Sequence, residues 1–428
     1  MDNPGSQLNV QSLAEAFAQA SRVGLGGEPK DSAKLVELAS QAPVVRLVDM
    51  ILLEAVNRRA SDVHIEAFEK EVAIRYRIDG RCYHVAKPPK SLAMAIASRI
   101  KVLANLDVAE LRLPQDGRLL LTLEKRQIDL RVSTLPTMYG ESIVLRVLDR
   151  GALTLTLTQL GMDEAIQQSI ESLIALPHGL LLVTGPTGAG KTTTLYSCLS
   201  KLNQPQVKLI TTEDPVEYDI AGLVQVAVNP KIELNFSTCL RAILRHDPDV
   251  IMVGEIRDQD TARIAIQAAL TGHLVFSTLH TNDAPGAMTR LLDMGLEPFL
   301  VSSTITGVLA QRLVRRLCQA CRAPYEATVE DAAALRITAA QLKKPLMRAA
   351  GCDQCQGIGY KGRLGLYELL IMTDALRPLI MEHAEITAFR ALARTQGMRS
   401  LRDDGIAKVL AGETSVEEMV RETQDYEE

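Results

Sequence analysis

Apolar and polar positions follow two different patterns in the first third of the chain. Over residues 44–59 the apolar residues recur at helical spacing, which predicts an amphipathic helix. Residues 72–78 instead alternate between apolar and polar and end at Asp79 and Gly80, a strong hairpin signal. The same criteria predict a return strand, a second helix and three further strands, at 82–85, 92–104, 118–123, 128–132 and 143–147. This order of elements predicts an α+β domain that ends near residue 150.

The middle of the chain has continuous apolar runs in place of alternation. Four such runs, separated by helical stretches, occur at 180–184, 207–212, 249–253 and 273–278. Strands that are apolar throughout are typical of a parallel sheet covered by helices on both faces. We therefore predict an α/β domain whose ligand binds beyond the carboxyl ends of the strands.

A glycine-rich loop follows the first of these runs. Residues 185–192 read Gly-Pro-Thr-Gly-Ala-Gly-Lys-Thr, which is the G-x-x-x-x-G-K-[ST] pattern of phosphate loops. Glycines allow backbone N–H groups to surround a polyphosphate at the start of a helix. Lys191 is placed to reach the β- and γ-phosphates of ATP, and Thr192 to ligate Mg²⁺. The predicted nucleotide-binding residues are Gly185, Pro186, Thr187, Gly188, Ala189, Gly190, Lys191, Thr192 and Thr193. The alternative is a plain glycine turn, but the complete pattern between a strand and a helix favours phosphate binding.

Acidic residues and a histidine follow the other three predicted strands. Glu213, Asp214 and Glu217 follow the second strand, Glu255 follows the third, and His280 follows the fourth. Because the carboxyl ends of parallel strands meet at one edge, we expect these side chains to face the phosphate loop. A carboxylate there can hold Mg²⁺ through water or orient the attacking water. Glu255 is the residue that we predict for this role.

Four of the seven cysteines form two C-x-x-C pairs about thirty residues apart, Cys318 with Cys321 and Cys352 with Cys355. Four thiolates from two such turns suit tetrahedral zinc in a reducing compartment. The alternative is a redox dithiol, which would not need a matched second pair. Because protein would fill all four zinc positions, the predicted site is structural rather than catalytic.

Length and charge set further limits. With 428 residues the chain is long enough for about two or three domains. The net charge of -5 argues against a chain that coats nucleic acid, and no apolar run is long enough to span a membrane. Because residues 1–8 are polar and lack a secretory signal, we expect a cytoplasmic protein.

We expect six segments in all. They are a flexible N-terminal arm with a short helix near 10–21, the α+β domain, a linker, the ATPase domain, a tetracysteine zinc subdomain and a helical C-terminal region, at 1–42, 43–150, 151–160, 161–311, 312–363 and 364–428. The acidic last residues, from 413 on, are expected to form a helix.

Several motifs together resemble one family. The phosphate loop is followed by an acidic box at 213–217, a Walker B-like Ile-Met-Val-Gly-Glu at 251–255 and a histidine box at 271–280. In this order they resemble the secretion ATPases of type II secretion and type IV pilus assembly. The resemblance covers residue 60 to the C-terminus and includes four N-terminal motifs, at 60–66, 75–80, 114–118 and 129–134. The tetracysteine block is similar to that of the general secretion pathway protein E and pilus-extension branches, whereas the retraction ATPases lack it.

The resemblance implies a fold and roles for individual residues. It implies a RecA-like P-loop NTPase domain, preceded by a smaller PAS-like domain and followed by a zinc knuckle and C-terminal helices. Glu255 would serve catalysis together with Glu213, while His273 and His280 would sense or position phosphate. A structural role is the alternative for either histidine.

Arginines of the N-terminal domain are the remaining catalytic candidates. In this family such arginines close over the nucleotide, and here they correspond to Arg118 and Arg131. Arg75, Arg77 and Arg146 also lie on predicted strands of that domain. Two arginines at the γ-phosphate would neutralise charge in the transition state, whereas the alternative for each is a solvated strand residue.

The resemblance also implies partners. Family members form a cytoplasmic homo-hexamer at the inner membrane, on a platform protein, and dock to membrane-anchored secretion components through an extra N-terminal domain. Only about forty residues precede the predicted α+β domain here. A cluster of arginines at 312, 315, 316 and 322 could meet acidic phospholipids or an acidic partner, or form an ordinary solvated face.

The predicted function is therefore an ATPase that drives pseudopilus assembly and protein export in type II secretion. The alternatives are a type IV pilus extension ATPase, a nucleic-acid motor and a nucleotide-dependent scaffold without turnover. The absence of tryptophan, the few aromatic residues and the negative charge argue against nucleic acid as a partner. Lys191, Thr192 and Glu255 argue for hydrolysis.

Overall fold

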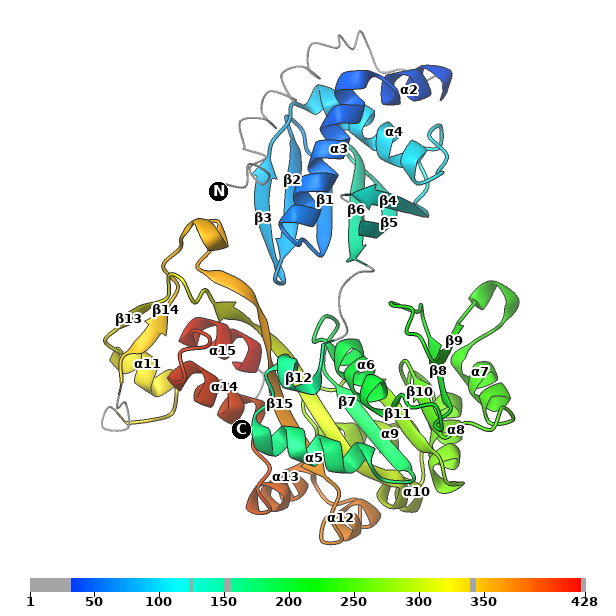
Figure 1. Ribbon diagram of the computed structural model, residues 1–428, viewed down its shortest axis with the longest axis vertical. Coiled ribbons are helices and arrows are strands. Elements are labelled where there is room, and N and C mark those ends of the chain that lie inside the picture. The colour runs from blue at the N-terminus through cyan, green and yellow to red at the C-terminus, as the bar shows by residue number, and fades with distance from the viewer. Residues whose placement is uncertain (1–31, 124–125, 150–154, 339–343, 425–428) are drawn as a thin grey trace. The chain divides into compact units, whose positions relative to one another are not determined.

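The computed structural model describes residues 32–123, 126–149, 155–338 and 344–424 (Figure 1). The chain divides into two units, an N-terminal unit of residues 1–152 and a C-terminal unit of residues 153–428. Each unit has its own hydrophobic core and is described by itself. Among the described residues, no helix is both long enough and apolar enough to cross a membrane.

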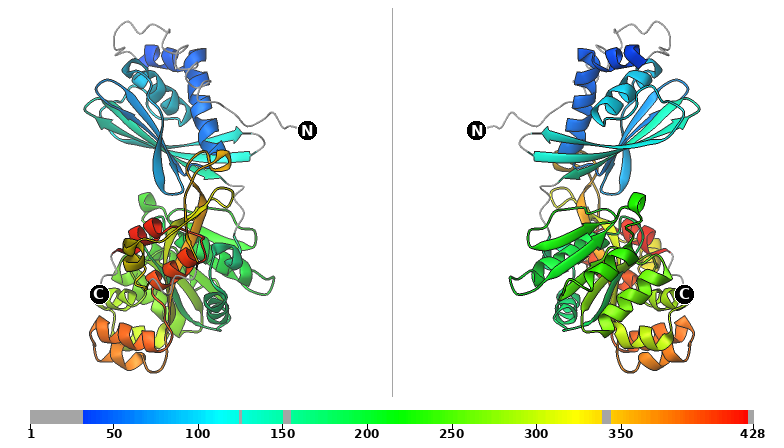
Figure 2. Two further views of the ribbon diagram at one scale, coloured as in Figure 1. Left: turned by 90° about the vertical axis from the view of Figure 1, so that its left-hand side faces the viewer. Right: turned by 90° about the vertical axis from the view of Figure 1, so that its right-hand side faces the viewer.

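The N-terminal unit is built on an antiparallel sheet with strand order β3-β2-β1-β6-β5-β4 (Figures 1 and 2). The strands are β1 Asp62–Ala67, β2 Val72–Ile78, β3 Arg81–Ala86, β4 Gln115–Leu123, β5 Arg126–Thr137 and β6 Gly140–Asp149. The helices are α2 Ser32–Ala39, α3 Ala42–Asn57, the 3₁₀ turn η1 Lys90–Leu92 and α4 Ala93–Leu103. Alternation along the strands gives the sheet one apolar face, against which α3 and α4 pack. The hydroxyl of Tyr76 in β2 donates to the carbonyl of Ile51 in α3 at 2.7 Å.

Most of the predicted elements of this unit are confirmed, but two elements differ from the prediction. Strand β1 was not predicted as a strand, although most of it lies in the family motif at 60–66. Helix α2 lies within the segment that was predicted to be a flexible arm. The helix is stabilised by burial of Leu35 and Leu38, the latter in a small cluster with Val44 and Ala95. The helix predicted near 10–21 lies outside the described residues.

The C-terminal unit contains a seven-stranded sheet of order β15-β12-β7-β11-β10-β8-β9, in which only β15 is antiparallel to its neighbour. Its strands are β7 Gly179–Thr184, β8 Leu209–Glu213, β9 Leu223–Ala227, β10 Val250–Val253, β11 Leu274–Leu279, β12 Ile305–Leu317 and β15 Tyr360–Ile371. The parallel sheet and the four strands predicted from apolar runs are confirmed. The carboxyl end of β7 lies between the ends of β11 and the middle of β12, which places the phosphate loop among residues from both.

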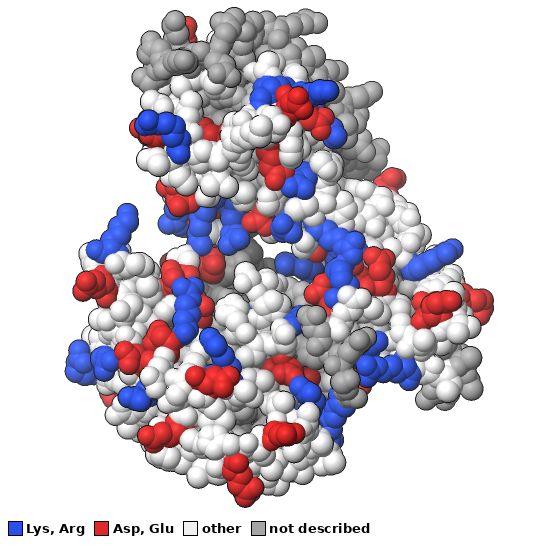
Figure 3. Space-filling model, turned by 180° about the vertical axis from the view of Figure 1, so that it is seen from behind, with Lys and Arg blue, Asp and Glu red and all other residues white. Residues whose placement is uncertain are grey.

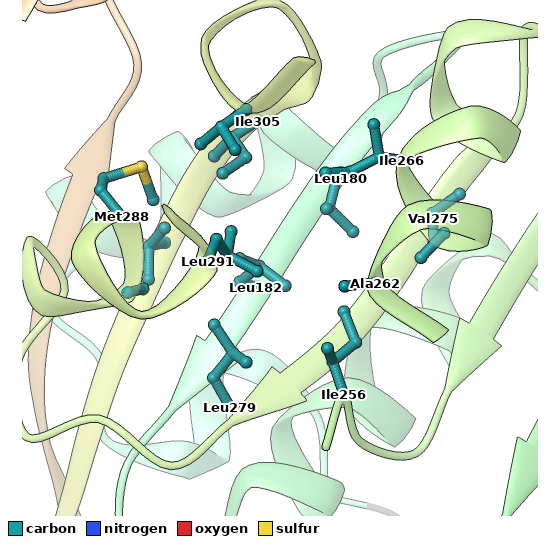
Figure 4. Packing of buried hydrophobic residues seen from close by; sticks show 14 of the residues in the cluster. Leu180, Leu182, Ile256, Ala262, Ile266, Val275, Leu279, Met288, Leu291 and Ile305 are labelled. Atoms are coloured by element: carbon teal, nitrogen blue, oxygen red, sulfur yellow. The ribbon is translucent and has the colours of Figure 1, made fainter. Parts of the chain in front are cut away.

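Helices cover both faces of this sheet. Alternate residues of β7 belong to different cores, since Leu181 and Val183 pack with α5 Glu164–Ile174 and α6 Lys191–Leu202. Leu180 and Leu182 pack on the opposite face, where Figure 4 shows them beside Ala262 and other core residues. The helices on that second face are α7 Phe236–Ile243, α8 Gln259–Leu270, α9 Gly286–Asp293 and α10 Pro298–Thr304. Short 3₁₀ turns occur at η2 Leu157–Leu160 and η3 Pro230–Ile232.

Two long strands in the last third of the chain were not predicted. Strands β12 and β15 pair over most of their length and extend the sheet beyond β7. The predicted boundaries at 311 and 363 fall inside them, so the tetracysteine segment is an insertion between two strands of one sheet. The insertion contains β13 Ala323–Tyr325, α11 Val329–Ala334, β14 Leu346–Arg348 and the turn η5 Asp353–Cys355. The predicted C-terminal helices follow as α12 Arg377–Met381, α13 Ile386–Thr395, α14 Leu401–Leu410 and α15 Val416–Thr423.

Candidate active site and metal centre

The phosphate loop connects β7 to α6, as its sequence predicts. Gly185, Gly188 and Gly190 have φ of 146°, 83° and 86°, a backbone region that residues other than glycine rarely adopt. A Cβ on Gly185 would also lie 2.4 Å from the carbonyl oxygen of Gln311. Thr192 is exposed in the first turn of α6. Both conformation and space therefore require glycine in this loop.

Lys191 is buried beneath the loop. Its Nζ donates to the carbonyl oxygens of Gly185 at 2.7 Å and Pro186 at 3.1 Å, and the residue is 9% exposed. The pKa of Lys191 is lowered to about 8, mainly by burial; Glu255 opposes this shift and nearby Arg312 adds to it. A phosphate bound in the loop would give this ammonium group a negatively charged partner in place of the two neutral carbonyl oxygens.

The carboxylate of Glu255 lies between two basic side chains at the carboxyl ends of the strands. Its Oε2 lies 3.4 Å from Nε2 of His280, and its Oε1 forms an ion pair with Arg257. Arg257 also lies 3.7 Å from the carboxylate of Asp214. The structure therefore brings together residues that follow β8, β10 and β11, as predicted. Arg257 is a site residue that the sequence alone did not single out.

Gly254 precedes Glu255 in a confined position. A Cβ at this position would lie 3.2 Å from the carbonyl oxygen of Thr212 and 3.4 Å from the Cα of Glu213. The carbonyl of Gly254 accepts the hydroxyl of Thr278 at 2.7 Å. An aspartate would not fit here without moving β8, so the carboxylate at the end of β10 belongs to Glu255.

Glu213 is buried at the end of β8 and is hydrogen-bonded on both oxygens. Its Oε1 accepts from Thr211 at 2.6 Å and Gln225 at 3.1 Å, and its Oε2 accepts from the hydroxyl of Tyr196. Tyr196 lies in α6, so the carboxylate ties the helix of the phosphate loop to β8 and β9. Burial, followed by Glu213, raises the pKa of Tyr196 and keeps its hydroxyl a donor. These contacts favour a positioning role, and direct catalysis by Glu213 stays a prediction.

The two histidines of the histidine box lie at opposite ends of β11. His280 follows the strand and faces Glu255, whereas His273 precedes it. Six residues separate them, which is about 20 Å of extended chain. Nδ1 of His273 lies 3.0 Å from the carbonyl of Ala268 and 3.2 Å from the hydroxyl of Thr271. Within one chain these contacts favour the structural alternative for His273, and its phosphate contact stays a prediction.

The candidate arginines form a row across the N-terminal sheet. Arg118 in β4 is opposite Arg131 in β5, which is opposite Arg146 in β6, all on the face away from the helices. Arg118 is paired with Asp129, with Nε donating to Oδ1 at 2.6 Å, and Arg146 lies 3.2 Å from Asp62. The row belongs to one unit and the phosphate loop to the other, so the role of Arg118 and Arg131 at the nucleotide stays a prediction.

Strand β12 contributes residues to the site that sequence reasoning assigned elsewhere. The side-chain oxygen of Gln311 accepts the hydroxyl of Thr194 in α6 at 2.7 Å. Arg312 is buried beside the loop and lies 3.4 Å from the side-chain oxygen of Asn282. The signal for both residues was weak, because it depends on β12 being the neighbour of β7.

Two of the four arginines that could form a basic surface around the first cysteine pair are buried. Arg312 and Arg315 are each 5% exposed. Arg315 lies 3.9 Å from the centre of the Tyr360 ring, and its Nη2 is 2.7 Å from Glu418. Arg316 pairs with Glu413, and Arg322 donates to the carbonyl of Gly412. Glu418 of α15 thus pairs with Arg315, and Glu413, in the loop before α15, pairs with Arg316. The buried Arg312 and Arg315 are therefore not part of an exposed basic surface.

The four cysteines of the insertion come together as predicted. The Sγ atoms of Cys318, Cys321, Cys352 and Cys355 lie within 4.8 Å of one another, with separations of 3.9, 3.8 and 3.8 Å for three pairs. A zinc ion with four sulfur ligands at about 2.3 Å has S···S separations of about 3.8 Å. A disulfide would need about 2.05 Å. Backbone N–H groups of Gly351 and Gly359 also donate to sulfur. This group could therefore hold zinc.

Known proteins resemble the chain over most of its length. Residues 37–421 match the protein family described as "Type II/IV secretion system protein". The chain belongs to this family. A relative is "Type II secretion system protein E" of Pseudomonas aeruginosa, which is 51% identical over 420 residues, covering 98% of this chain and 83% of that protein. "Type II secretion system ATPase E" of Vibrio cholerae is 50% identical over 403 residues, covering 94% of this chain and 79% of that protein.

Two solved structures share the fold. The pilus retraction motor PilT with bound ADP matches with a TM-score of 0.58 and 27% identity, covering 88% of this chain and 96% of that one. The ATPase DotB of Legionella pneumophila matches with a TM-score of 0.67 and 22% identity, covering 89% and 96%. The family model and the relatives confirm the predicted family resemblance, and the α/β fold with its antiparallel N-terminal sheet is shared with PilT and DotB.

Proposed function

We propose that this chain is the ATPase of a type II secretion system, which hydrolyses ATP at the phosphate loop and drives pseudopilus assembly and protein export. One observation carries the proposal. The loop with Lys191, the carboxylate of Glu255 and the ring of His280 converge at one edge of the sheet of a single unit. The close relatives named for type II secretion support the choice of this system over type IV pilus extension.

The chain's own residues divide the reaction among them. Backbone N–H groups of the loop and Lys191 bind the phosphates. Thr192 would ligate Mg²⁺, which would supply positive charge to the bound phosphates. Glu255 orients the attacking water and accepts its proton, and His280 with Arg257 holds this carboxylate in place. Gln311 and Glu213 keep α6, and with it the loop, in position.

The family resemblance extends the proposal to the whole machine. The C-terminal unit is a RecA-like domain and the N-terminal sheet a PAS-like domain, whose Arg118 and Arg131 reach the γ-phosphate as arginine fingers. Six copies form a ring on an inner-membrane platform protein, so that release of these arginines after hydrolysis turns into movement. The protein would then be cytoplasmic and peripheral to the inner membrane, with zinc as a structural ion at the four cysteines.

Phosphate release from ATP by the purified chain tests the activity. Lys191→Ala should abolish release in the presence of Mg²⁺, because the loop loses the charged side chain that is proposed to bind the phosphates. Lys201→Ala is the matched control, since Lys201 lies in the same helix α6 but pairs with Glu171 at 2.6 Å on the surface. Release that persists in Lys191→Ala would show that the site is wrong.

Two further measurements separate the alternative functions. Acidic side chains lie among the basic ones on the face in Figure 3, which supports a partner other than nucleic acid. Filter binding with single- and double-stranded DNA at physiological salt should give no retention, and tight binding would favour a nucleic-acid motor. Inner-membrane proteins that co-purify with the chain should include a secretion platform, whereas a pilus platform would favour the pilus alternative.

A further inference from the structure

Glu368 is a buried carboxylate that the reaction described above does not use. It lies in β15, is 3% exposed and accepts two backbone N–H groups, from Ala284 at 2.7 Å and from Leu401 at 3.4 Å. Ala284 belongs to the loop that follows β11 and carries His280, and Leu401 is the first residue of α14. Burying a carboxylate costs free energy unless its oxygens are hydrogen-bonded, so the two backbone N–H groups offset the cost of placing Glu368 here.

The position of Glu368 in the sheet explains why it meets this loop. Glu368 is opposite Ala310 in β12, and Ala310 is opposite Thr184, the last residue of β7. The loop crosses these three strands. At β7 the backbone N–H of Thr281 donates to the hydroxyl of Thr184 at 2.9 Å, and at β15 Ala284 donates to Glu368. The segment after His280 is therefore anchored at both ends of its path over the sheet.

A third contact holds the same loop from the C-terminal helices. The carboxylate of Asp283 forms an ion pair with Arg390 of α13, with Oδ2 and Nη2 2.5 Å apart. Its other oxygen accepts the N–H of Gly286 at 2.8 Å, and the carbonyl of Asp283 accepts the hydroxyl of Thr281 at 2.9 Å. The loop is thus cross-linked within itself as well as to α13.

We propose that Glu368 is a positioning residue for ATP hydrolysis, which acts by holding the loop that places His280 beside Glu255. This inference rests on the proposed function, because it requires His280 to take part in the reaction. Its effect reaches the reacting atoms only through the backbone of the 280–284 loop. Glu368 therefore influences the rate of hydrolysis and leaves the phosphate loop, and with it nucleotide affinity, unchanged.

The substitution Glu368→Gln probes this role with little change in volume. The amide offers one acceptor oxygen, so one of the two N–H groups faces an NH₂ group that cannot accept. Asp404→Asn is the matched control. Asp404 is also buried and accepts a backbone N–H of β15, that of Tyr367 at 2.9 Å, but its side chain pairs with Lys408 of α14.

A double-mutant cycle on the full chain, with kcat and KM for ATP, tests the proposal. Glu368→Gln should lower kcat about tenfold with KM within about twofold, whereas Asp404→Asn should leave kcat per folded molecule unchanged. On a His280→Ala background Glu368→Gln should lower kcat no further, because the group that it positions is gone. If the role of Glu368 were purely structural, Glu368→Gln would reduce the folded fraction, but kcat per folded molecule and KM would both stay at the wild-type values.

The outcomes are distinguishable. If His280→Ala itself leaves kcat unchanged, the proposed role of His280 fails and this inference fails with it. If His280→Ala lowers kcat but Glu368→Gln does not, or if the two losses multiply, the inference alone is overturned. Should Glu368→Gln fail to fold, Arg390→Met replaces it in the same cycle, because Arg390 is partly exposed and acts on the loop through Asp283.

Discussion

The buried position of Lys191 predicts that nucleotide binding depends on pH in a range where most lysines do not titrate. An ordinary lysine has a pKa of 10.5, whereas burial lowers that of Lys191 to about 8. The bound phosphates favour the charged form and raise this pKa again, so binding takes up a proton at alkaline pH. Affinity should therefore fall as the pH rises above about 8.

The size of the effect follows from the pKa. At pH 9.5 only about 3% of a lysine with a pKa near 8 carries its proton, so the affinity should fall about thirtyfold between pH 7 and 9.5, or by about 2 kcal/mol. At pH 8 about half a proton should be taken up for each nucleotide bound. Above pH 7.5 the γ-phosphate is fully ionised and adds little to this slope.

A fluorescent, non-hydrolysable ATP analogue at constant free Mg²⁺ and salt provides the assay, and calorimetry in two buffers of different ionisation enthalpy measures the proton uptake. Lys191→Arg is the control, because arginine stays charged throughout this range. Its affinity should be lower at every pH but nearly constant between pH 7 and 9.5. A wild-type affinity that changes less than about threefold, or an arginine variant with the same slope, would refute the reasoning.

Three further predictions concern stability, metal and catalysis. Burial raises the pKa of Glu368 from 4.5 to about 7, assisted by Asp283 and opposed by Arg390, so the folded state binds the proton more tightly than the unfolded chain. The free energy of unfolding of the wild type should therefore fall relative to Glu368→Gln as the pH rises from 4.5 to 7, by roughly 3 kcal/mol in denaturant titrations, and parallel curves would contradict this. A strong chelator, or Cys355→Ser, should increase hydrogen exchange across 318–359 while β7 to β11 stay protected, and one zinc per chain should restore protection to the chelated wild type only. Glu255→Gln should reduce phosphate release at least about a hundredfold with nucleotide affinity within about threefold, and equal losses in both would place Glu255 in binding instead.

Local patterns were enough for the elements that carry the chemistry. The phosphate loop and the two C-x-x-C turns are contiguous in the chain, and each works through residues a few positions apart. The strands that are apolar throughout could also be predicted locally, because burial on both faces requires an apolar residue at nearly every position. Order along the chain then placed Glu255 and His280 at one edge, because parallel strands all end on the same side.

Strands β12 and β15 show where local patterns fail. Residues 311–316 of β12 include Gln311, Arg312, Arg315 and Arg316, which indicate a solvated basic segment. In the fold these side chains meet Thr194, Asn282, Glu418 and Glu413, which are all far away in sequence. Partners at such separations leave no local trace, so both the strand and its burial were missed.

By itself, the sequence determined the nucleotide-binding loop, the four-cysteine cluster and the family of secretion ATPases, because these properties depend on short stretches of chain. Only the tertiary structure decided which neighbours complete the site. Pairing of β15, β12 and β7 brings Glu368 to the loop of His280, and His273 lies at the end of β11 opposite to His280. The physical reason is that burial and the pairing of charges are properties of side chains brought together across the sheet, which spacing along the chain does not encode.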